Sequence, residues 1–255
     1  MSDIRQEATI TVPVDPSNPV EFLACCGLLE LAHSFWGVKA VGRFGDNIFD
    51  LRIPTSDEAI NFKDISIQTD DEKDPIHPID LFIKGRSIHL DWWLNLPNSS
   101  KDNSPFKTWA GTQKVYKNLL QPIFEKALEK GDDIVECFQY TANLSKRLGA
   151  DTRSSWNKID AGFSPDCQNM KIPIFVMVEF LSAVGLQRFR PDKVSVKKEK
   201  GKNVMWCYFL WKDHYLPAPL ACVAKKILPE QCVQGFEFSV QRNGNYKYFS
   251  QAIKI

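Results

Sequence analysis

The sequence signatures of several common classes of protein are absent from this chain. The seven cysteines are odd in number and form no C-x-x-C pair, and no histidine stands beside them at ligand spacing. That pattern argues against a disulfide framework and against a zinc site. No P-loop, dinucleotide fingerprint or Ser-His-Asp pattern is present, so we expect no cofactor and no bound metal.

Long apolar runs are also missing. The run from Pro19 to Trp36 is interrupted by Glu21, Glu30 and His33, and the N-terminus lacks the residue order of a signal peptide. We therefore expect a cytoplasmic protein that does not cross a membrane, with reduced and mostly buried thiols. The remaining composition, with 44% hydrophobic and 25% charged residues, is typical of a globular protein.

The net charge of +1 conceals an asymmetry along the chain. Residues 147–255 hold 17 Lys and Arg against 9 Asp and Glu, whereas residues 1–146 hold 15 against 22. A basic half is a candidate nucleic-acid surface, and an acidic half is a candidate surface for docking on other proteins.

One octapeptide pattern occurs twice. EFLACCGL begins at Glu21, and EFLSAVGL begins at Glu179 with the same five residues at the same spacing. Each copy lies in an apolar stretch and precedes two strand-like segments, which suggests a duplicated domain. If so, Gly27 and Gly185 should each lie where a helix passes closely over its own sheet, because a glycine inside a helix costs about 1 kcal/mol relative to alanine.

Periodicity and turn residues predict an α+β protein. In the first half we predict a strand at residues 8–14, a capped helix at 19–36 and a hairpin at 40–53, followed by an acidic excursion at 55–80. A second hairpin at 80–92, a loop at 95–105 and two helices at 112–130 and 133–148 complete this half. In the second half we predict strand, helix, strand, strand, helix and strand, at residues 156–163, 173–187, 193–198, 203–211, 217–228 and 235–241, with a final hairpin strand at 246–255. This βαββαβ order is that of a ferredoxin-like domain.

Three ordered segments resemble a known family: NPVEFLACCGLLELAHSFW from Asn18, SPFKTWAGTQ from Ser104, and DTRSSWNKIDAGFSPD with VEFLSAVGLQRFRP between Asp151 and Pro191. They are similar to a CRISPR-associated family of type I-U systems, later called I-G. The resemblance implies a non-catalytic subunit of an RNA-guided interference complex in antiviral defence, in a large-subunit-like, small-subunit-like or guide-processing role. It also implies ferredoxin-like (RAMP-like) halves, which we place at residues 1–148 and 149–255, with guide RNA, target DNA and other CRISPR-associated subunits as partners.

Candidate nucleic-acid contacts fall in three groups. The first stands at a predicted helix entrance, where free N–H groups favour phosphate: Lys107, Gln113 and Lys114, with Trp109 to stack a base. The second is a lysine-rich hairpin that could follow a phosphate backbone: Lys193, Lys197, Lys198, Lys200 and Lys202. The third consists of arginines, whose planar fork suits phosphate, and a nearby lysine: Arg147, Arg153, Arg188, Arg190 and Lys158, with Arg153 the leading candidate.

Each group also has a structural interpretation: a packed tryptophan at a capped helix, a solvated edge strand, and cations that meet a helix dipole. No catalytic constellation stands out. His214 beside Tyr215 is the most plausible acid–base pair, for metal-independent RNA cleavage through a 2′-hydroxyl. A binding subunit is thus the leading hypothesis, with a CRISPR RNA-processing endoribonuclease and a protein-only scaffold as alternatives.

Overall fold

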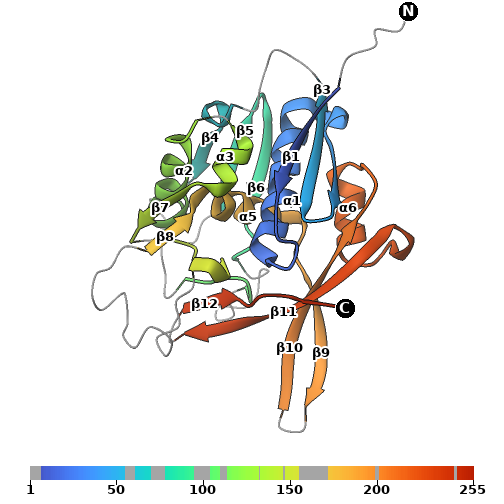
Figure 1. Ribbon diagram of the computed structural model, residues 1–255. Helices are drawn as coiled ribbons and strands as arrows, with labels where there is room; N and C mark the ends of the chain where they lie inside the picture. The colour runs from blue at the N-terminus through green and yellow to red at the C-terminus, as the bar shows by residue number, and fades with distance from the viewer. Residues whose placement is uncertain are drawn as a thin grey trace, which may run out of the picture.

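The chain folds as an α+β protein in which every pairing between described strands is antiparallel. The computed structural model describes residues 7–54, 61–69, 78–94, 104–109, 114–131, 133–145, 147–154, 172–198, 201–243 and 246–255, with the backbone alone at 172, 195–198, 201–203 and 243. Figure 1 shows small sheets around a central pair of helices. The α+β class predicted from sequence is confirmed.

The N-terminal unit contains β1 (Glu7–Pro13), α1 (Pro19–Trp36), β2 (Val41–Gly45) and β3 (Ile48–Pro54). Its sheet has the order β1-β3-β2, so β3 lies between the two strands that α1 connects. Helix α1 begins as predicted, because the Asn18 side chain accepts a hydrogen bond from the backbone N–H of Val20 at 3.1 Å and Pro19 occupies the first turn. It ends at Gly37, whose φ of 63° suits glycine.

A second small sheet contains β4 (Ser66–Thr69), β5 (Ile79–Ile83) and β6 (Arg86–Leu90), in that order. The predicted hairpin at residues 80–92 is confirmed as the β5–β6 pair. Lys84 and Gly85 form its turn, both with positive φ. The predicted excursion at 55–80 is wrong for residues 66–69, because β4 pairs along β5 over the whole of its length.

The helical region differs more from its prediction. It contains a π-helical turn η3 (Val115–Leu120), α2 (Gln121–Leu128), α3 (Ile134–Gln139) and β7 (Thr141–Leu144). The helix predicted at 133–148 is therefore wrong after Gln139. Strand β7 pairs with the distant β8 (Ile172–Phe175), and this long-range pairing ends α3 early.

The C-terminal part contains α5 (Val176–Arg188), β9 (Asp192–Lys198), β10 (Gly201–Trp211), α6 (Pro217–Ala224), β11 (Cys232–Asn243), β12 (Tyr246–Phe249) and β13 (Ile253–Lys254). Its sheet has the order β12-β11-β10-β9, with β13 also paired to β11. Short 3-10 turns lie at Gly37–Lys39, Phe62–Asp64, Thr152–Ser154 and Pro229–Gln231. In Figure 1 the β9–β10 hairpin extends away from the body and diverges from the β11–β12 hairpin.

The repeated octapeptides form the two sides of a single helix crossing between α1 and α5. A Cβ atom on Gly27 would lie 1.9 Å from the carbonyl oxygen of Leu181, and one on Gly185 would lie 2.0 Å from that of Leu23. The two contacts are equivalent, since Leu23 and Leu181 occupy the same place in the repeat. Close backbone approach does explain both glycines, but the prediction that each faces its own sheet is wrong.

The strand orders around the two helices also differ. Strand β1 pairs with β3 in the N-terminal unit, whereas β8, the corresponding strand before α5, pairs with β7 and has no partner in the β12-β11-β10-β9 sheet. The predicted match between the two halves is therefore wrong at the level of sheet order. One hydrophobic core includes residues of both parts, from Val12 to Ala252. The predicted strand at 156–163 lies outside the described residues, and the division at residue 148 stays a prediction.

Candidate nucleic-acid interface

The segment Ser104–Trp109 packs against the C-terminal sheet and is joined to β12 by a backbone hydrogen bond. The backbone N–H of Lys247 donates a hydrogen bond to the carbonyl oxygen of Thr108 at 2.8 Å. The ring of Phe106 packs edge-on against Trp206, with centroids 4.6 Å apart, and against Phe249 at 5.9 Å. The segment that sequence placed at a helix entrance is thereby joined to a sheet about a hundred residues or more away in the chain.

Trp109 is a core residue, and its predicted role in stacking a base is wrong. Only 6% of its surface is exposed, and its ring packs edge-on against Trp92 with centroids 5.8 Å apart. The Lys107 ammonium lies 5.7 Å from the centre of the same ring. Gln113, predicted beside it, lies outside the described residues, and Lys114 directly precedes the π-helical turn, half-buried.

Three cations from three chain segments come together here, and we call Lys107, Arg242 and Lys247 the cation cluster. Arg242 faces Lys247 across the β11–β12 pair. Burial lowers the pKa of Lys107, and the positive charge of Lys247 lowers it further. Burial likewise lowers the pKa of Lys247, followed by the charge of Arg242. Lys247 thus repels both Lys107 and Arg242, and Lys107 and Lys247 are partly desolvated, which favours the binding of an anion.

The lysine-rich hairpin adjoins the cation cluster through Trp206. The exposed Lys193 stands opposite Trp206 in the β9–β10 register, and directly opposed residues share one face of a sheet. Trp206 in turn contacts Phe106, the neighbour of Lys107. Farther out, the backbone register pairs Lys197 with Lys202 and Lys198 with Gly201. The side chains of Lys197, Lys198 and Lys202 and the whole of Lys200 lie outside the described residues.

Arg153, the leading candidate from sequence, is bound within the protein. Its Nη1 atom lies 2.5 Å from Oε1 of Glu21, and its Nη2 atom lies 2.5 Å from Oδ2 of Asp151. The guanidinium also covers the ring of Phe175 at 3.7 Å. Two carboxylates and an aromatic face therefore occupy the fork that we predicted for phosphate, because α1, the end of β8 and the 151–154 turn converge on it.

Two other arginines bind carboxylates in the same way. Arg188 forms an ion pair with Glu30, and Nη2 of Arg190 lies 3.6 Å from Oδ1 of Asp91. Arg147 lies near Glu179 and lowers the pKa of that carboxyl, although less than burial raises it. Lys158 lies outside the described residues. The predicted arginine group thus lies among acidic groups of the protein.

Buried carboxylates on the two central helices match these arginines. Burial raises the pKa of Glu21 on α1 and of Glu30 on the same helix, while Arg153 and Arg188 respectively oppose the shift. Glu179 on α5 is fully buried, and burial raises its pKa to about 7, although both carboxylate oxygens accept hydrogen bonds from the N–H of Gly149 at 3.0 Å. Solvent thus hardly reaches the carboxylates of Glu21, Glu30 and Glu179, whereas the Arg153 and Arg188 side chains stay 34% and 48% exposed.

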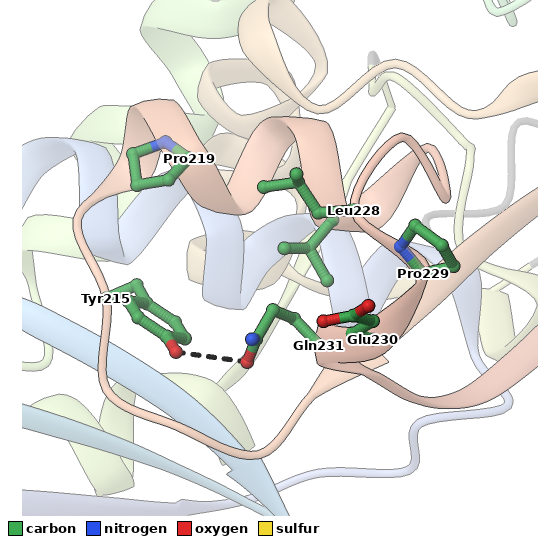
Figure 2. Close-up of a pocket in the computed structure, with 7 residues that line it drawn as sticks. Tyr215, Pro219, Leu228, Pro229, Glu230 and Gln231 are labelled. Atoms are coloured by element: carbon green, nitrogen blue, oxygen red, sulfur yellow. Dashed lines mark hydrogen bonds between the residues drawn. The ribbon is translucent and has the colours of Figure 1, made fainter.

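The predicted acid–base pair does not form a shared site. The Tyr215 hydroxyl donates a hydrogen bond to Oε1 of Gln231 at 3.0 Å, in a pocket of about 430 Å³. Figure 2 shows the pocket walls, formed largely by Pro219, Leu228 and Pro229. His214 does not line this pocket, and burial lowers its pKa, followed by the charges of Arg52 and Arg43.

Sequence reasoning missed two members of the cation cluster, Arg242 and Lys247. The available signal was the alternation of aromatic and cationic residues in YKYF (246–249), directly after the turn that the sequence predicts across Asn243 and Gly244. That stretch was assigned only a structural role. The signal is local, whereas the closeness of Lys107 depends on a backbone contact that links Thr108 to Lys247.

Within the described part of the chain, no three His, Cys, Asp or Glu side chains are placed to hold a metal ion. No helix in that part is both long and apolar enough to cross a membrane. Comparison with known proteins found no matching family model, no similar curated protein and no similar solved structure.

Proposed function

We propose that the chain is a nucleic-acid-binding, non-catalytic subunit of a cytoplasmic CRISPR RNA-guided interference complex. In this proposal it binds the backbone of guide RNA, target DNA or both, and its acidic half contacts neighbouring subunits in antiviral defence. The observation that carries the binding function is the cation cluster of Lys107, Arg242 and Lys247, with Lys193 at the base of the lysine-rich hairpin linked to it through Trp206 and Phe106. The three ordered sequence segments support membership of the complex.

Phosphate is the ligand that fits this surface best. Like charges held close together in partly desolvated surroundings raise the energy of the free protein, and a bound polyanion offsets that repulsion. The paired part of β11 and β12, which we call the β11–β12 ribbon, carries no carboxylate among its described residues from Val240 to Arg242 and from Lys247 to Phe249. Contacts of this kind fix the position of a backbone without reading its sequence.

The finer fold assignment belongs to the same proposal. The β1-α1-β2-β3 unit, with β3 between β1 and β2, has the strand order of a split βαβ motif, on which ferredoxin-like domains are built. We propose that the N-terminal part derives from such a domain. The C-terminal part keeps the predicted element order along the chain but has a different sheet order, so its ferredoxin-like origin rests on that element order alone.

The test is the salt dependence of binding to labelled RNA and DNA, for the full chain alone and with its operon partners. We expect the affinity to fall steeply with salt, and each of Lys107→Met and Lys247→Gln to reduce the slope of log affinity against log salt by about 0.7 to 0.9. Lys126→Gln is the matched control, because Lys126 pairs with Glu129 on the distant helix α2. Absence of salt-sensitive binding in every preparation would overturn the proposal.

The same preparations separate the two alternatives. An endoribonuclease would cut repeat RNA without added metal, and His214→Ala would abolish the cleavage if His214 were its acid–base group. A protein-only scaffold would co-purify with partner subunits and carry no nucleic acid.

A further inference from the structure

Exposed apolar side chains gather at one end of the C-terminal sheet. Among the described residues, eight large hydrophobic side chains are exposed, and five of them come from two short stretches: Ile227, Leu228, Val233, Ile253 and Ile255. The two stretches adjoin, because the side-chain amide of Gln234 donates a hydrogen bond to the carbonyl oxygen of Ile255 at 2.8 Å. A concentration of this kind marks an interaction surface, whereas singly scattered hydrophobic residues do not.

Part of this group lies on the face of the C-terminal sheet that is turned away from α1, which we call the outer face. Tyr208 of β10 marks the inner face, because its ring stacks on Phe22 of α1 with centroids 4.2 Å apart. Successive side chains of a strand point to opposite faces, so Phe209 points outward. A Cβ atom on Gly235 would lie 2.6 Å from the Phe209 ring and 2.8 Å from Cγ1 of Ile255. Ile255, which is 55% exposed, therefore lies on the outer face.

Charged side chains of both signs lie beside the two isoleucines. Glu237 stands directly opposite Ile253, which is 69% exposed, and directly opposite Cys207 on β10, so all three share the outer face. The Cys207 thiol senses the charges around it. Burial raises its pKa to about 11, the charges of Asp192 and Glu237 add to the rise, and the charge of Lys226 opposes it. A cation and two carboxylates are therefore near one thiol.

Lys226 is held over the sheet in a fixed position. Its ammonium lies 5.1 Å from the centre of the Phe209 ring. Its backbone φ of 58° is a conformation that residues with side chains rarely adopt, and its N–H donates a hydrogen bond to the carbonyl oxygen of Val223 at 2.8 Å. Neither Lys226 nor Glu237 forms an ion pair with any residue that the structure describes. Both charges are thus available to a partner.

We propose that the outer face of the C-terminal sheet binds a second copy of this chain in a two-fold symmetric dimer, with Ile253 and Ile255 at the centre and Lys226 of each copy paired with Glu237 of the other. A surface with charges of one sign needs a partner of the opposite sign. A surface with both signs can bind itself, because a two-fold contact brings each residue of an interacting pair to its counterpart twice. An apolar centre with a charged rim is the usual composition of a protein interface. This inference goes beyond the proposed function and does not depend on it.

The first test is the mass of the full, nuclease-treated chain in solution, measured by sedimentation velocity over a range of concentrations. We expect a dimer, and we expect Ile255→Asp to raise its dissociation constant about tenfold or more, because the change places a charge in the apolar centre. Val38→Asp is the control, since Val38 is 71% exposed in the N-terminal part, and it should change the constant by less than about twofold. Thermal melts should show that both variants stay folded, because both sites are exposed.

The second test exchanges the charges. Lys226→Glu alone or Glu237→Lys alone brings like charges together across the contact, so each should weaken the dimer about tenfold. A mixture of these two variants should form dimers again, because each copy then meets the opposite charge in the other. Lys254→Glu is the matched control: Lys254 stands opposite Phe236, whose ring stacks on Tyr208 at the inner face, so this change should leave the dimer intact.

Three results would overturn the inference: a chain that is monomeric at every concentration, a dimer that persists in Ile255→Asp, or charge variants that stay monomeric when mixed. If the chain is a monomer alone and Ile255→Asp prevents co-purification of an operon partner, the surface binds that other protein and the second copy is again overturned. None of these measurements involves nucleic acid, so their failure is distinct from failure of the proposed function.

Discussion

The central helix crossing and the C-terminal ribbon handle charge in opposite ways. At the crossing, Arg153 and Arg188 bind buried carboxylates that belong to the protein itself. At the β11–β12 ribbon, burial and the charge of Lys247 lower the pKa of Lys107, and burial and the charge of Arg242 lower the pKa of Lys247. A cation at the crossing therefore stabilises the fold, whereas Lys247 lies opposite another cation, Arg242, an arrangement that favours an anionic ligand.

This difference explains why the leading sequence candidate was misplaced. Arg153 stands in a polar turn that resembles a phosphate-binding loop in composition, but the fold brings Glu21 to it from more than a hundred residues away. Lys247 stands in a short strand that sequence treated as structural. Cation content alone does not mark a binding surface, because the placement of the carboxylates decides which charges remain available.

The largest expected effect concerns the packing at the helix crossing. Gly27→Ala places a Cβ atom 1.9 Å from the carbonyl oxygen of Leu181, a backbone atom that cannot move without shifting α5. We expect a loss of more than about 3 kcal/mol in the free energy of unfolding, measured by urea denaturation, and a similar loss for Gly185→Ala. Val38→Ala, at a site 71% exposed, is the control and should change it by less than about 0.5 kcal/mol. Near-normal stability in both glycine variants would contradict the crossing.

Glu179 predicts a pH dependence of stability. Its pKa is about 7 in the folded protein against an ordinary value of 4.5, so the folded state holds the proton more tightly than the unfolded state. Its contribution is therefore fully present below about pH 4.5 and is lost as pH rises through 7, by about 3 kcal/mol in total. Urea denaturation at pH 5 and pH 8 should show this decline, and Glu179→Gln should flatten it. If Glu179→Gln lost as much stability between pH 5 and pH 8 as the original protein, other titratable groups would cause the loss.

Arg153→Met should destabilise the protein by about 2 kcal/mol at pH 8. It leaves the carboxylates of Glu21 and Asp151 buried without their shared partner, and the loss is discounted because the Arg153 side chain is 34% exposed. The loss should shrink at pH 5, where Glu21 can take up a proton. Nucleic-acid affinity should stay within about twofold. A large loss of affinity in a folded Arg153→Met protein would restore this residue to the interface.

The smallest expected effect on stability belongs to Lys107→Met. This change removes the repulsion by Lys247 and also the contact of the Lys107 ammonium with the Trp109 ring, two effects of opposite sign, so the free energy of unfolding should change by less than about 1 kcal/mol. The same variant should bind nucleic acid more weakly and with a shallower salt slope. A clear loss of stability, with binding unchanged, would show that Lys107 stabilises the fold and does not bind nucleic acid.

Local signals in the sequence account for the elements that were predicted well. The bounds of α1 follow from Asn18, Pro19 and Gly37, each of which acts on its own turn of helix. Hairpins β2–β3 and β5–β6 likewise follow from turn residues between alternating strands. The end of α3 at Gln139 could not be predicted in this way, because it depends on the pairing of β7 with β8, about thirty residues farther along the chain.

The candidate site was predictable only in its parts. The lysine-rich hairpin and Lys107 were each visible in composition, but their placement around one sheet depends on the contact between Phe106 and Trp206. The burial of Trp109 was equally hidden, since its partner Trp92 stands in a different segment. Residue type indicated the chemistry, and tertiary pairing decided which residues take part.

Backbone contacts of β12 and of the residues after it bear on the order in which the protein folds. Backbone N–H groups of Lys247, Phe249 and Ala252 donate to carbonyl oxygens of Thr108, Ala150 and Ser17, respectively. One short stretch thus closes onto three segments that leave the ribosome long before it. Until residues 247–252 are made, those three carbonyl groups lack their native donors, so the final stage of folding must follow the synthesis of this stretch.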